Sequence, residues 1–304
     1  MTDLPAIDGA RPEWLRRKER GSAWSIRLGV RLAIALGRPV ARLFLPLGSL
    51  YFLLSAPKAR QASRDYLGRA LGRPTRLLDV FRHYHTFGAC ILDRVFFLKR
   101  RTDLFDLRIV GEELLTDLLA EKSGCILLGA HLGSFEVLRA VGRAHPDLRV
   151  NMLMFEENAQ KIGSVLGDIA PDLAKEVISL GRPDAFIRTS RSLEQGHFVG
   201  LLADRSLNRD HQVRVPFLGA PAPFSIGAFR MMALLRKPVL LMVGLYRGGN
   251  RYDIHIERFA MPDDKPRRAS AADIEALAAR YAARLEYHCR AAPYNWFNFY
   301  KFWE

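Results

Sequence analysis

The chain has 304 residues, of which 49% are hydrophobic and 26% charged, and this composition excludes an intrinsically disordered protein. Its 46 Lys and Arg against 32 Asp and Glu give a net charge of +14, which favours anionic partners. A genome whose base composition favours arginine codons would produce the same excess of positive charge. Three cysteines that form no CxxC pair indicate a reducing compartment and neither a disulfide framework nor a zinc site: Cys90, Cys125 and Cys289.

The first sixty residues are predicted to form a basic helical segment that associates with a membrane. Residues 1–21 lack the apolar core of a secretory signal. The longest uncharged run after them, residues 43–57, would cover about 22 Å as a helix, less than the hydrocarbon thickness of about 30 Å. Arg27 and Arg31 lie one turn apart, a spacing typical of an amphipathic helix in the lipid interface. The alternatives are a helix packed on the protein's own core and a short tilted insertion.

The rest of the chain, residues 61–304, is predicted to form a single α/β domain. Residues 60–100 keep a helical spacing of apolar side chains, and after Gly111 short apolar runs alternate with helical segments. This alternation predicts a mostly parallel mixed sheet flanked by helices. The predicted strands are 125–130, 148–155, 176–181, 197–204, 238–247 and 252–259, and the predicted helices are 112–124, 134–145, 156–170, 183–196, 224–237 and 270–290.

The run CILLGAHLGSFEVLRA, residues 125–140, places a histidine where a predicted strand ends. In an open α/β sheet, functional groups collect at the carboxyl ends of the strands, and His131 follows such an end. With Gly133 in the turn and Ser134 near the N-cap of the next helix, Glu136 in the first helical turn can fold back towards the imidazole. A carboxylate beside a histidine is typical of general-base catalysis. A purely structural histidine is the alternative.

Several common catalytic motifs are absent from the sequence. There is no GxSxG nucleophile elbow, no P-loop and no GxGxxG dinucleotide fingerprint. Their absence favours direct transfer, in which the acceptor itself is the nucleophile.

The run ILLGAHLGSFEVLRA resembles the H-x4-D/E motif of the lysophospholipid acyltransferase superfamily, in particular its bacterial branch with the lipid A lauroyl/myristoyl acyltransferases. Later segments are similar to that branch in the same order, and the resemblance covers about residues 20–304. They are GHFVGLLADRSLNRD, VRVPFLGAPAPFSIGAFRMMALLRKPVLLM and the aromatic ending APYNWFNFYKFW. The chain departs from the lipid A enzymes in its less clear N-terminal membrane segment, in Arg205 where they have Gln, and in the aromatic ending where they have an RR-type one. These departures leave the acceptor open.

The resemblance implies that His131 is the general base and Glu136 its partner. It implies an acyl thioester donor, on acyl carrier protein or coenzyme A, and a lipid hydroxyl or amine as acceptor at the cytoplasmic face of the cell inner membrane, with no metal or other cofactor. The predicted substrate-binding residues are Ser134, Asp204, Arg205 and Arg214. For the three charged residues among them, ion pairing away from the substrate is the alternative.

Two other functions stay open at the level of the sequence. A hydrolase such as a thioesterase could use the same two residues on water. A non-enzymatic protein that binds nucleic acid or a membrane would agree with the net charge, but no recognised nucleic-acid motif accompanies that charge. We therefore expect a membrane-associated acyltransferase with no nucleic-acid partner. The aromatic ending is expected to pack in the core, with a membrane-interface belt as the alternative.

Overall fold

The computed structural model describes residues 23–137, 141, 145, 148–155, 177–180, 182–205, 211–262 and 269–304. Its strands are β1 (Asp106–Val110), β2 (Cys125–Gly129), β3 (Val150–Phe155), β4 (Val177–Leu180), β5 (Phe198–Leu202), β6 (Gln212–Phe217), β7 (Ala220–Ser225), β8 (Val239–Gly248) and β9 (Arg251–Ala260). Its helices are α2 (Ala23–Leu43), α3 (Leu45–Ser55), α4 (Pro57–Leu71), α5 (Leu77–Leu98), α6 (Glu112–Ala120), α9 (Ala185–Glu194), α10 (Ile226–Leu235) and α11 (Ala271–Ala291), with 3-10 turns η1 (Thr102–Leu104) and η2 (Phe135–Val137).

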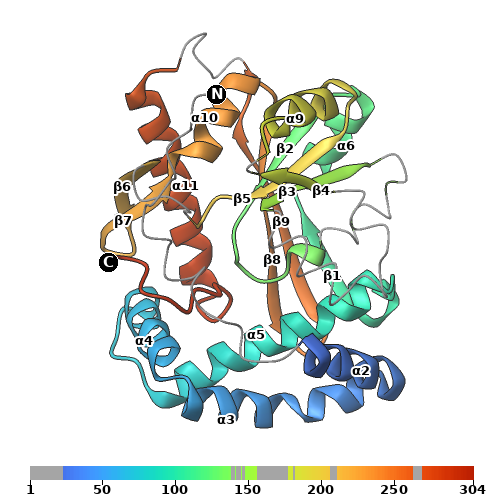
Figure 1. The fold of residues 1–304 in the computed structure, drawn as a ribbon, viewed down its shortest axis with the longest axis vertical. Helices are drawn as coiled ribbons and strands as arrows, with labels where there is room; N and C mark the ends of the chain where they lie inside the picture. Colours follow the sequence, from blue (N-terminus) through green and yellow to red (C-terminus); the bar gives the residue numbers. More distant parts are fainter. Residues whose placement is uncertain are drawn as a thin grey trace, which may run out of the picture.

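Seven of these strands form one sheet in the order β1-β9-β8-β2-β5-β3-β4 (Figure 1). β8, β2, β5, β3 and β4 run parallel, β9 is antiparallel to β8, and β1 is parallel to β9. The predicted α/β domain with a mostly parallel mixed sheet flanked by helices is therefore confirmed. β2 lies in the middle of the sheet and is buried along its whole length, which explains its uniformly apolar sequence CILLG.

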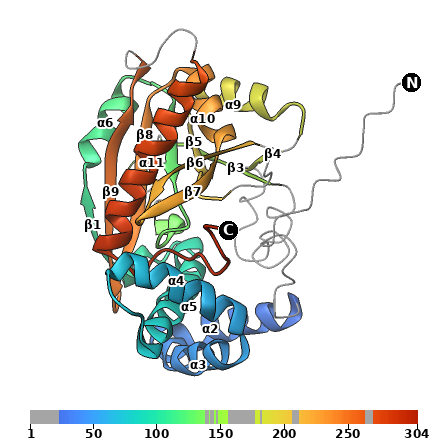
Figure 2. The same ribbon diagram turned by 90° about the vertical axis from the view of Figure 1, so that its left-hand side faces the viewer.

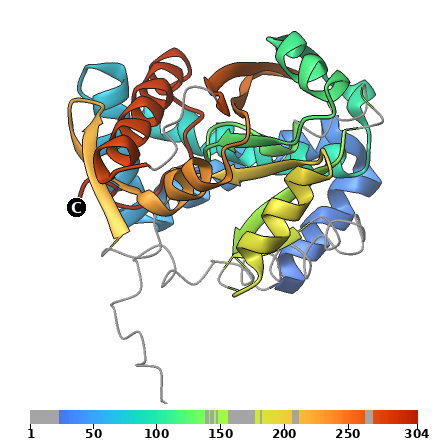
Figure 3. The ribbon, with the colours of Figure 1, turned by 90° about the horizontal axis from the view of Figure 1, so that it is seen from above.

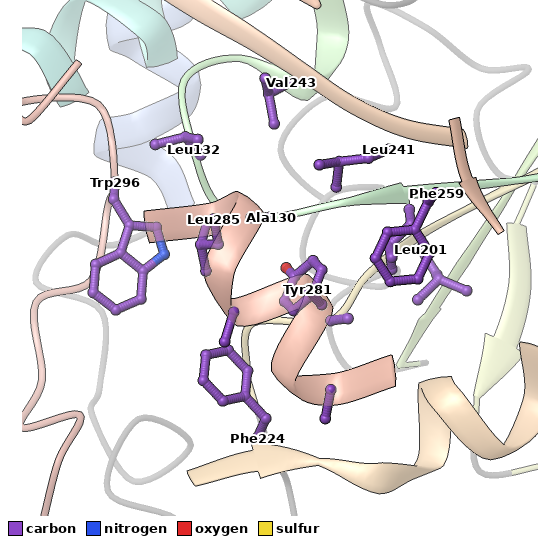
Figure 4. Close-up of a cluster of buried hydrophobic side chains, with 14 of the residues drawn as sticks. Ala130, Leu132, Leu201, Phe224, Leu241, Val243, Phe259, Tyr281, Leu285 and Trp296 are labelled. Carbon is purple, nitrogen blue, oxygen red and sulfur yellow. The ribbon is translucent and has the colours of Figure 1, made fainter. Parts of the chain in front are cut away.

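Helices cover both faces of the sheet, with α6 on one side and α9 and α10 on the other (Figure 3). The side chains of β2 alternate between the two hydrophobic clusters that result. Ile126 and Leu128 belong to the cluster around Tyr281 of α11 (Figure 4), whereas Cys125 and Leu127 belong to the cluster formed with α5 and α6. The two clusters fix the central strand from both sides, and with it the position of the residues that follow its carboxyl end.

The helices α2, α3, α4 and α5 lie together at one end of the molecule (Figure 2). Arg38 of α2 forms a buried, bidentate ion pair with Asp93 of α5, at 2.8 and 2.9 Å, and Asp93 also accepts a hydrogen bond from the Tyr252 hydroxyl. This network ties the N-terminal helices to the sheet. Within the residues described, no helix combines the length and the apolar character needed to cross a bilayer. The predicted boundary near residue 60 stays a prediction.

Two features of the fold were not predicted: the edge strand β1 and the hairpin of β6 and β7. β1 alternates between exposed and half-buried residues and carries charged side chains, so it lacks the apolar run that marks the inner strands. β6 and β7 form a separate antiparallel hairpin in a stretch with several prolines, so that Phe224 and Ser225 lie in a strand and not in the predicted helix. Of the predicted helix 134–145, the described part contains η2, and the predicted helix 156–170 lies outside the described residues.

Candidate active site

The geometry around His131 follows from the pairing of two parallel strands. β2 and β5 are neighbours, and their register pairs Gly129 with Leu202. His131 and Asp204 each lie two residues beyond that pair, so they emerge side by side at the carboxyl edge of the sheet. The imidazole Nδ1 lies 2.8 Å from Asp204 Oδ1, and the His131 backbone N–H donates to Asp204 Oδ2 at 3.0 Å. His131 and Asp204 therefore form a hydrogen-bonded pair, here called the dyad.

The hydrogen bond to Asp204 determines which nitrogen of His131 carries the proton. An ionised carboxylate only accepts hydrogen bonds, so Nδ1 is the protonated nitrogen and Nε2 keeps its lone pair. The His131 side chain is 32% exposed, so Nε2 is within reach of a substrate. Desolvation within the surrounding protein lowers the pKa of His131, Arg205 and Arg94 lower it further, and Asp204 opposes them. The imidazole is consequently neutral at neutral pH and can accept a proton at Nε2.

Asp204 is held as a carboxylate in a buried position. Only 2% of its surface is exposed, and burial by itself raises its pKa. The His131 ring, the Arg205 guanidinium and a hydrogen bond from the indole Nε1 of Trp296, at 2.9 Å, outweigh that effect and lower the pKa of Asp204 to about 2. A charge so placed orients the imidazole and stabilises the imidazolium that forms when Nε2 takes a proton.

The loop that carries His131 is packed tightly between β8 and the C-terminal segment. Gly133 has φ +69°, and a Cβ atom there would overlap the carbonyl oxygen of Gly244 in β8. The backbone of residues 295–297 pairs with the same loop, because Gly133 N–H donates to the Asn295 carbonyl and Phe297 N–H donates to the His131 carbonyl, both at 2.8 Å. The loop is thus held by backbone hydrogen bonds on two sides.

Glu136, the predicted partner of His131, has a close contact with a different residue. It lies in η2 with 8% of its surface exposed, and its Oε1 is 2.9 Å from Nη2 of Arg94 in α5. The carboxylate that hydrogen-bonds His131 Nδ1 is that of Asp204. The predicted role of Glu136 beside His131 stays a prediction.

The predicted substrate-binding residues are distributed unevenly around the dyad. Arg205 follows Asp204, donates from Nη2 to the Phe297 carbonyl at 3.0 Å and lies near the dyad, since its charge affects both pKa values. Ser134 is buried in the His131 loop, with its backbone N–H on Gly244. Arg214 lies on β6 and donates to the Trp303 carbonyl at 2.8 Å. Contact of any of them with substrate stays a prediction.

The sequence missed two residues of this site, Arg94 and Trp296, and gave a third, Asp204, a different role. Asp204 was assigned to substrate binding because the pairing of β2 with β5 cannot be read from the chain. Arg94 looks like any exposed arginine on an amphipathic helix. Trp296 belongs to an aromatic run that was expected to pack in the core, and it does so, with its side chain fully buried. The equal offset of His131 and Asp204 from the ends of their strands is the one signal that could have joined them.

A cavity of about 580 Å³ lies at the opposite edge of the sheet, at the amino ends of β3 and β5. Its lining mixes aliphatic side chains with several basic and polar ones, and none of its lining residues belongs to the dyad or its neighbours. Among them are Arg149, Asn151, Arg188, Arg191 and His197. Its position, at the end of the sheet opposite to the dyad, does not suit an acyl chain that reacts beside His131.

Comparison with known proteins agrees with this arrangement. The family model of the bacterial lipid A biosynthesis acyltransferases matches residues 86–304, a range that contains the whole sheet and the dyad. A comparison with curated proteins finds no match to the chain. The family match excludes a purely non-enzymatic binding protein. This chain therefore belongs to the bacterial lipid A biosynthesis acyltransferase family and is an acyltransferase.

Proposed function

We propose that this acyltransferase moves a fatty acyl chain from a thioester of acyl carrier protein or coenzyme A to a hydroxyl or amine of a membrane lipid or lipid precursor. The observation that carries the proposal is the 2.8 Å contact between His131 Nδ1 and the buried carboxylate of Asp204, which leaves Nε2 as an accessible base. Family membership supports the reaction class and a lipid precursor as acceptor.

In the proposed reaction His131 transfers a proton and forms no covalent bond. Nε2 takes the proton from the acceptor hydroxyl or amine while the oxygen or nitrogen of that acceptor group attacks the thioester carbonyl. Asp204 stabilises the imidazolium in this step, and a base so placed contributes roughly 10²- to 10⁴-fold to the rate. The tetrahedral intermediate then collapses, the carbon–sulfur bond breaks, and the departing sulfur takes the proton back from Nε2. Atoms and charges balance without a metal or a redox cofactor.

Two arginines supply positive charge where the intermediate becomes negative. Arg94 and Arg205 both lower the pKa of His131, so their charges act on the imidazole. Glu136 holds Arg94 through the 2.9 Å contact, and 27% of the Arg94 side chain stays exposed. A guanidinium fixed in this way can bind a carbonyl oxygen that becomes an oxyanion, or an anionic group of the acceptor. This supports a role for Glu136 in the site, exerted through Arg94.

The N-terminal helices provide a surface suited to the cytoplasmic face of the cell inner membrane. Family membership suggests membrane association, and α3 contains no charged residue. Arg27 and Arg31 on the neighbouring α2 suit anionic lipid headgroups. Large apolar side chains are exposed along both helices, and together they form what we call the apolar face: Leu28, Leu32, Ile34, Leu36, Val40, Leu43, Phe44, Leu47, Leu50, Tyr51, Phe52 and Leu54. Exposed apolar side chains in this number on two consecutive helices are typical of an interaction surface and are costly to leave in water.

The proposal is tested by thiol release from acyl carrier protein and coenzyme A thioesters, with and without a lipid extract from a cytoplasmic membrane. We expect release that requires lipid and that falls at least roughly 100-fold in His131→Ala. His145→Ala is the control, because His145 pairs with Glu112 outside the dyad. Mass spectrometry of the lipid fraction then identifies the acylated acceptor.

Three outcomes of this experiment distinguish the possible activities. Release that depends on His131 but not on lipid would identify a thioesterase. A folded His131→Ala protein with full activity would remove the proposed mechanism. Release in the presence of only one donor would decide between acyl carrier protein and coenzyme A.

A further inference from the structure

Trp296 occupies a position where its side chain can act on the dyad. It is fully buried, and Figure 4 shows it near Leu132, which follows His131 in the chain. Leu132 and Trp296 also form a β-bridge, so the tryptophan backbone lies directly against the His131 loop. The indole Nε1 donates to Asp204 Oδ2 at 2.9 Å.

Together with the two N–H groups of His131, the indole N–H forms a set of hydrogen-bond donors that holds the Asp204 carboxylate in a single orientation. Oδ2 accepts from Trp296 Nε1 and from the His131 backbone N–H, while Oδ1 accepts from His131 Nδ1. Rotation of the carboxylate about its terminal torsion would break all three hydrogen bonds. Without the indole donor, only the His131 loop itself would hold the carboxylate, and the two partners of the dyad would shift together.

The indole is itself anchored from the far side. The Trp296 carbonyl accepts a hydrogen bond from His83 Nε2 at 2.8 Å, and His83 Nδ1 lies 2.8 Å from the Ser63 hydroxyl. The ring packs edge-on against the aromatic rings of Tyr66 and Phe302, with centroids 4.9 Å away in each case. Backbone and ring therefore give Nε1 a fixed position, which a positioning residue requires.

We propose that Trp296 is a positioning residue for the dyad, whose indole N–H fixes the Asp204 carboxylate in the orientation that holds His131 for proton transfer and moderates its negative charge. The inference deepens the proposed function and rests on it for its effect on the rate. Its effect on His131 itself can be measured without any substrate.

Removal of the N–H has a predictable direction. The carboxylate loses one of its donors and becomes a stronger acceptor for Nδ1–H, so His131 should bind a proton more tightly. The substitution leaves the other titratable and charged groups that act on the dyad chemically unchanged, so we attribute the expected change in the pKa of His131 to the loss of the indole N–H. They are Arg94 of α5, Glu136 through Arg94, Arg205 after β5, Tyr281 and Cys289 of α11, and Tyr300 of the C-terminal segment.

The test compares Trp296→Phe with Trp303→Phe. Trp303 belongs to the same aromatic group, but its indole donates to the Phe217 carbonyl, outside the dyad. The first readout is the rate at which diethyl pyrocarbonate modifies His131, followed by mass spectrometry of its peptide as a function of pH. We expect the midpoint to move up by roughly 0.5 to 1 pH unit in Trp296→Phe and to stay unchanged in Trp303→Phe. The second readout is acyl transfer, in which we expect kcat to fall roughly tenfold and KM to change little.

An isosteric replacement covers the case in which Trp296→Phe does not fold. Replacement of Trp296 by 3-benzothienylalanine keeps the shape of the ring and removes only the N–H. An unchanged His131 midpoint in either folded variant overturns the proposal, and so does an equal shift in Trp296→Phe and Trp303→Phe. If the wild-type protein turned over no thioester, the proposed function would fail, while the His131 midpoints would still decide the role of Trp296.

Discussion

Two histidines of this protein lie in contact with the same tryptophan segment and have opposite tasks. His131 has one nitrogen on a carboxylate and the other accessible, so it can accept a proton. His83 has both nitrogens on neutral partners inside the core. Because a carbonyl only accepts, His83 donates from Nε2 to Trp296 and accepts at Nδ1 from Ser63. Burial lowers the pKa of His83 to about 4, with only partial opposition from the Trp296 carbonyl.

The buried His83 predicts that the protein loses stability as the pH falls from about 6.5 to about 4. The unfolded chain, with an ordinary histidine pKa, binds a proton in this window that the folded chain excludes, so acidification favours unfolding. The free energy of unfolding should decrease by about 3 kcal/mol from this residue by pH 4. Urea unfolding of the wild type and of His83→Gln at several pH values measures the difference. Equal pH dependence of the two proteins would contradict the assignment.

A residue of the site could be predicted from the sequence only where its position relative to a recognisable strand or helix already indicates its role. His131 could be found because it follows a recognisable strand. The carboxylate beside it could not, because Glu136 is close in the chain while Asp204 is 73 residues away and meets His131 through strand pairing. Trp296 acts through an indole N–H whose partner depends on how the C-terminal segment returns to the sheet.

At the scale of elements, the junction of the His131 loop with β8 is the least tolerant part of the fold. Gly133 is in the left-handed region, and its backbone N–H and that of Ser134 donate to carbonyls on opposite sides of the loop. Gly244 allows the approach from the side of β8, since a Cβ there would overlap Val137. Glycines at both positions let the backbone of the His131 loop approach that of β8 closely, and this close approach fixes the position of His131 relative to the sheet.

Gly133→Ala should therefore destabilise the protein more than Gly72→Ala. Both glycines have similar positive φ, +69° and +64°, so both substitutions incur backbone strain of roughly 1 to 2 kcal/mol. At Gly72 no atom lies within 4 Å of the added methyl group, whereas at Gly133 it meets the Gly244 carbonyl. Denaturant unfolding of both variants measures the difference, which we expect to exceed about 1 kcal/mol. Equal losses would mean that the loop can move away from β8.

The elements themselves were predictable to the extent that they are buried. The inner strands appear as uninterrupted apolar runs because helices cover both faces, and α11, predicted as the helix 270–290, begins at a capping box formed by Ser270 and Asp273. β1 and the hairpin of β6 and β7 carry mixed or proline-rich sequences, and their partners are distant in the chain or across a tight turn. The order of the strands in the sheet could not be predicted either, because β2 pairs with β5 and β8, which are not its neighbours along the chain.

At the scale of the whole molecule, α5 connects the apolar face to the site around the dyad. The apolar face lies on α2 and α3, which pack against α5, and α5 also carries Arg94 beside Glu136. The buried pair of Arg38 and Asp93 makes this connection rigid. A lipid surface bound by the apolar face would thus have a defined position relative to the acyl-transfer site.

Substitution in the apolar face should weaken membrane binding without unfolding the protein. Leu43, Leu47 and Leu54 are 73%, 64% and 69% exposed, so they contribute little to the core. Changing all three to Ser should reduce binding to vesicles with anionic lipid at least roughly tenfold, because each leucine buries apolar area only in the bilayer. Leu234→Ser is the control, since Leu234 is 70% exposed on α10, away from this face. Equal binding by the triple variant and the wild type would show that another surface contacts the lipid.

The dyad is tested most directly by the kcat of Asp204→Asn beside that of Glu136→Gln in the thiol-release reaction. An asparagine amide can donate to His131 Nδ1 and so move the ring proton to Nε2, which removes the base. We expect kcat to fall roughly 10³- to 10⁴-fold in Asp204→Asn. The loss in Glu136→Gln should be much smaller, because its contact in the site is Arg94. The reverse order, with Glu136→Gln inactive and Asp204→Asn close to wild type, would contradict the assignment of Asp204 as the partner of His131.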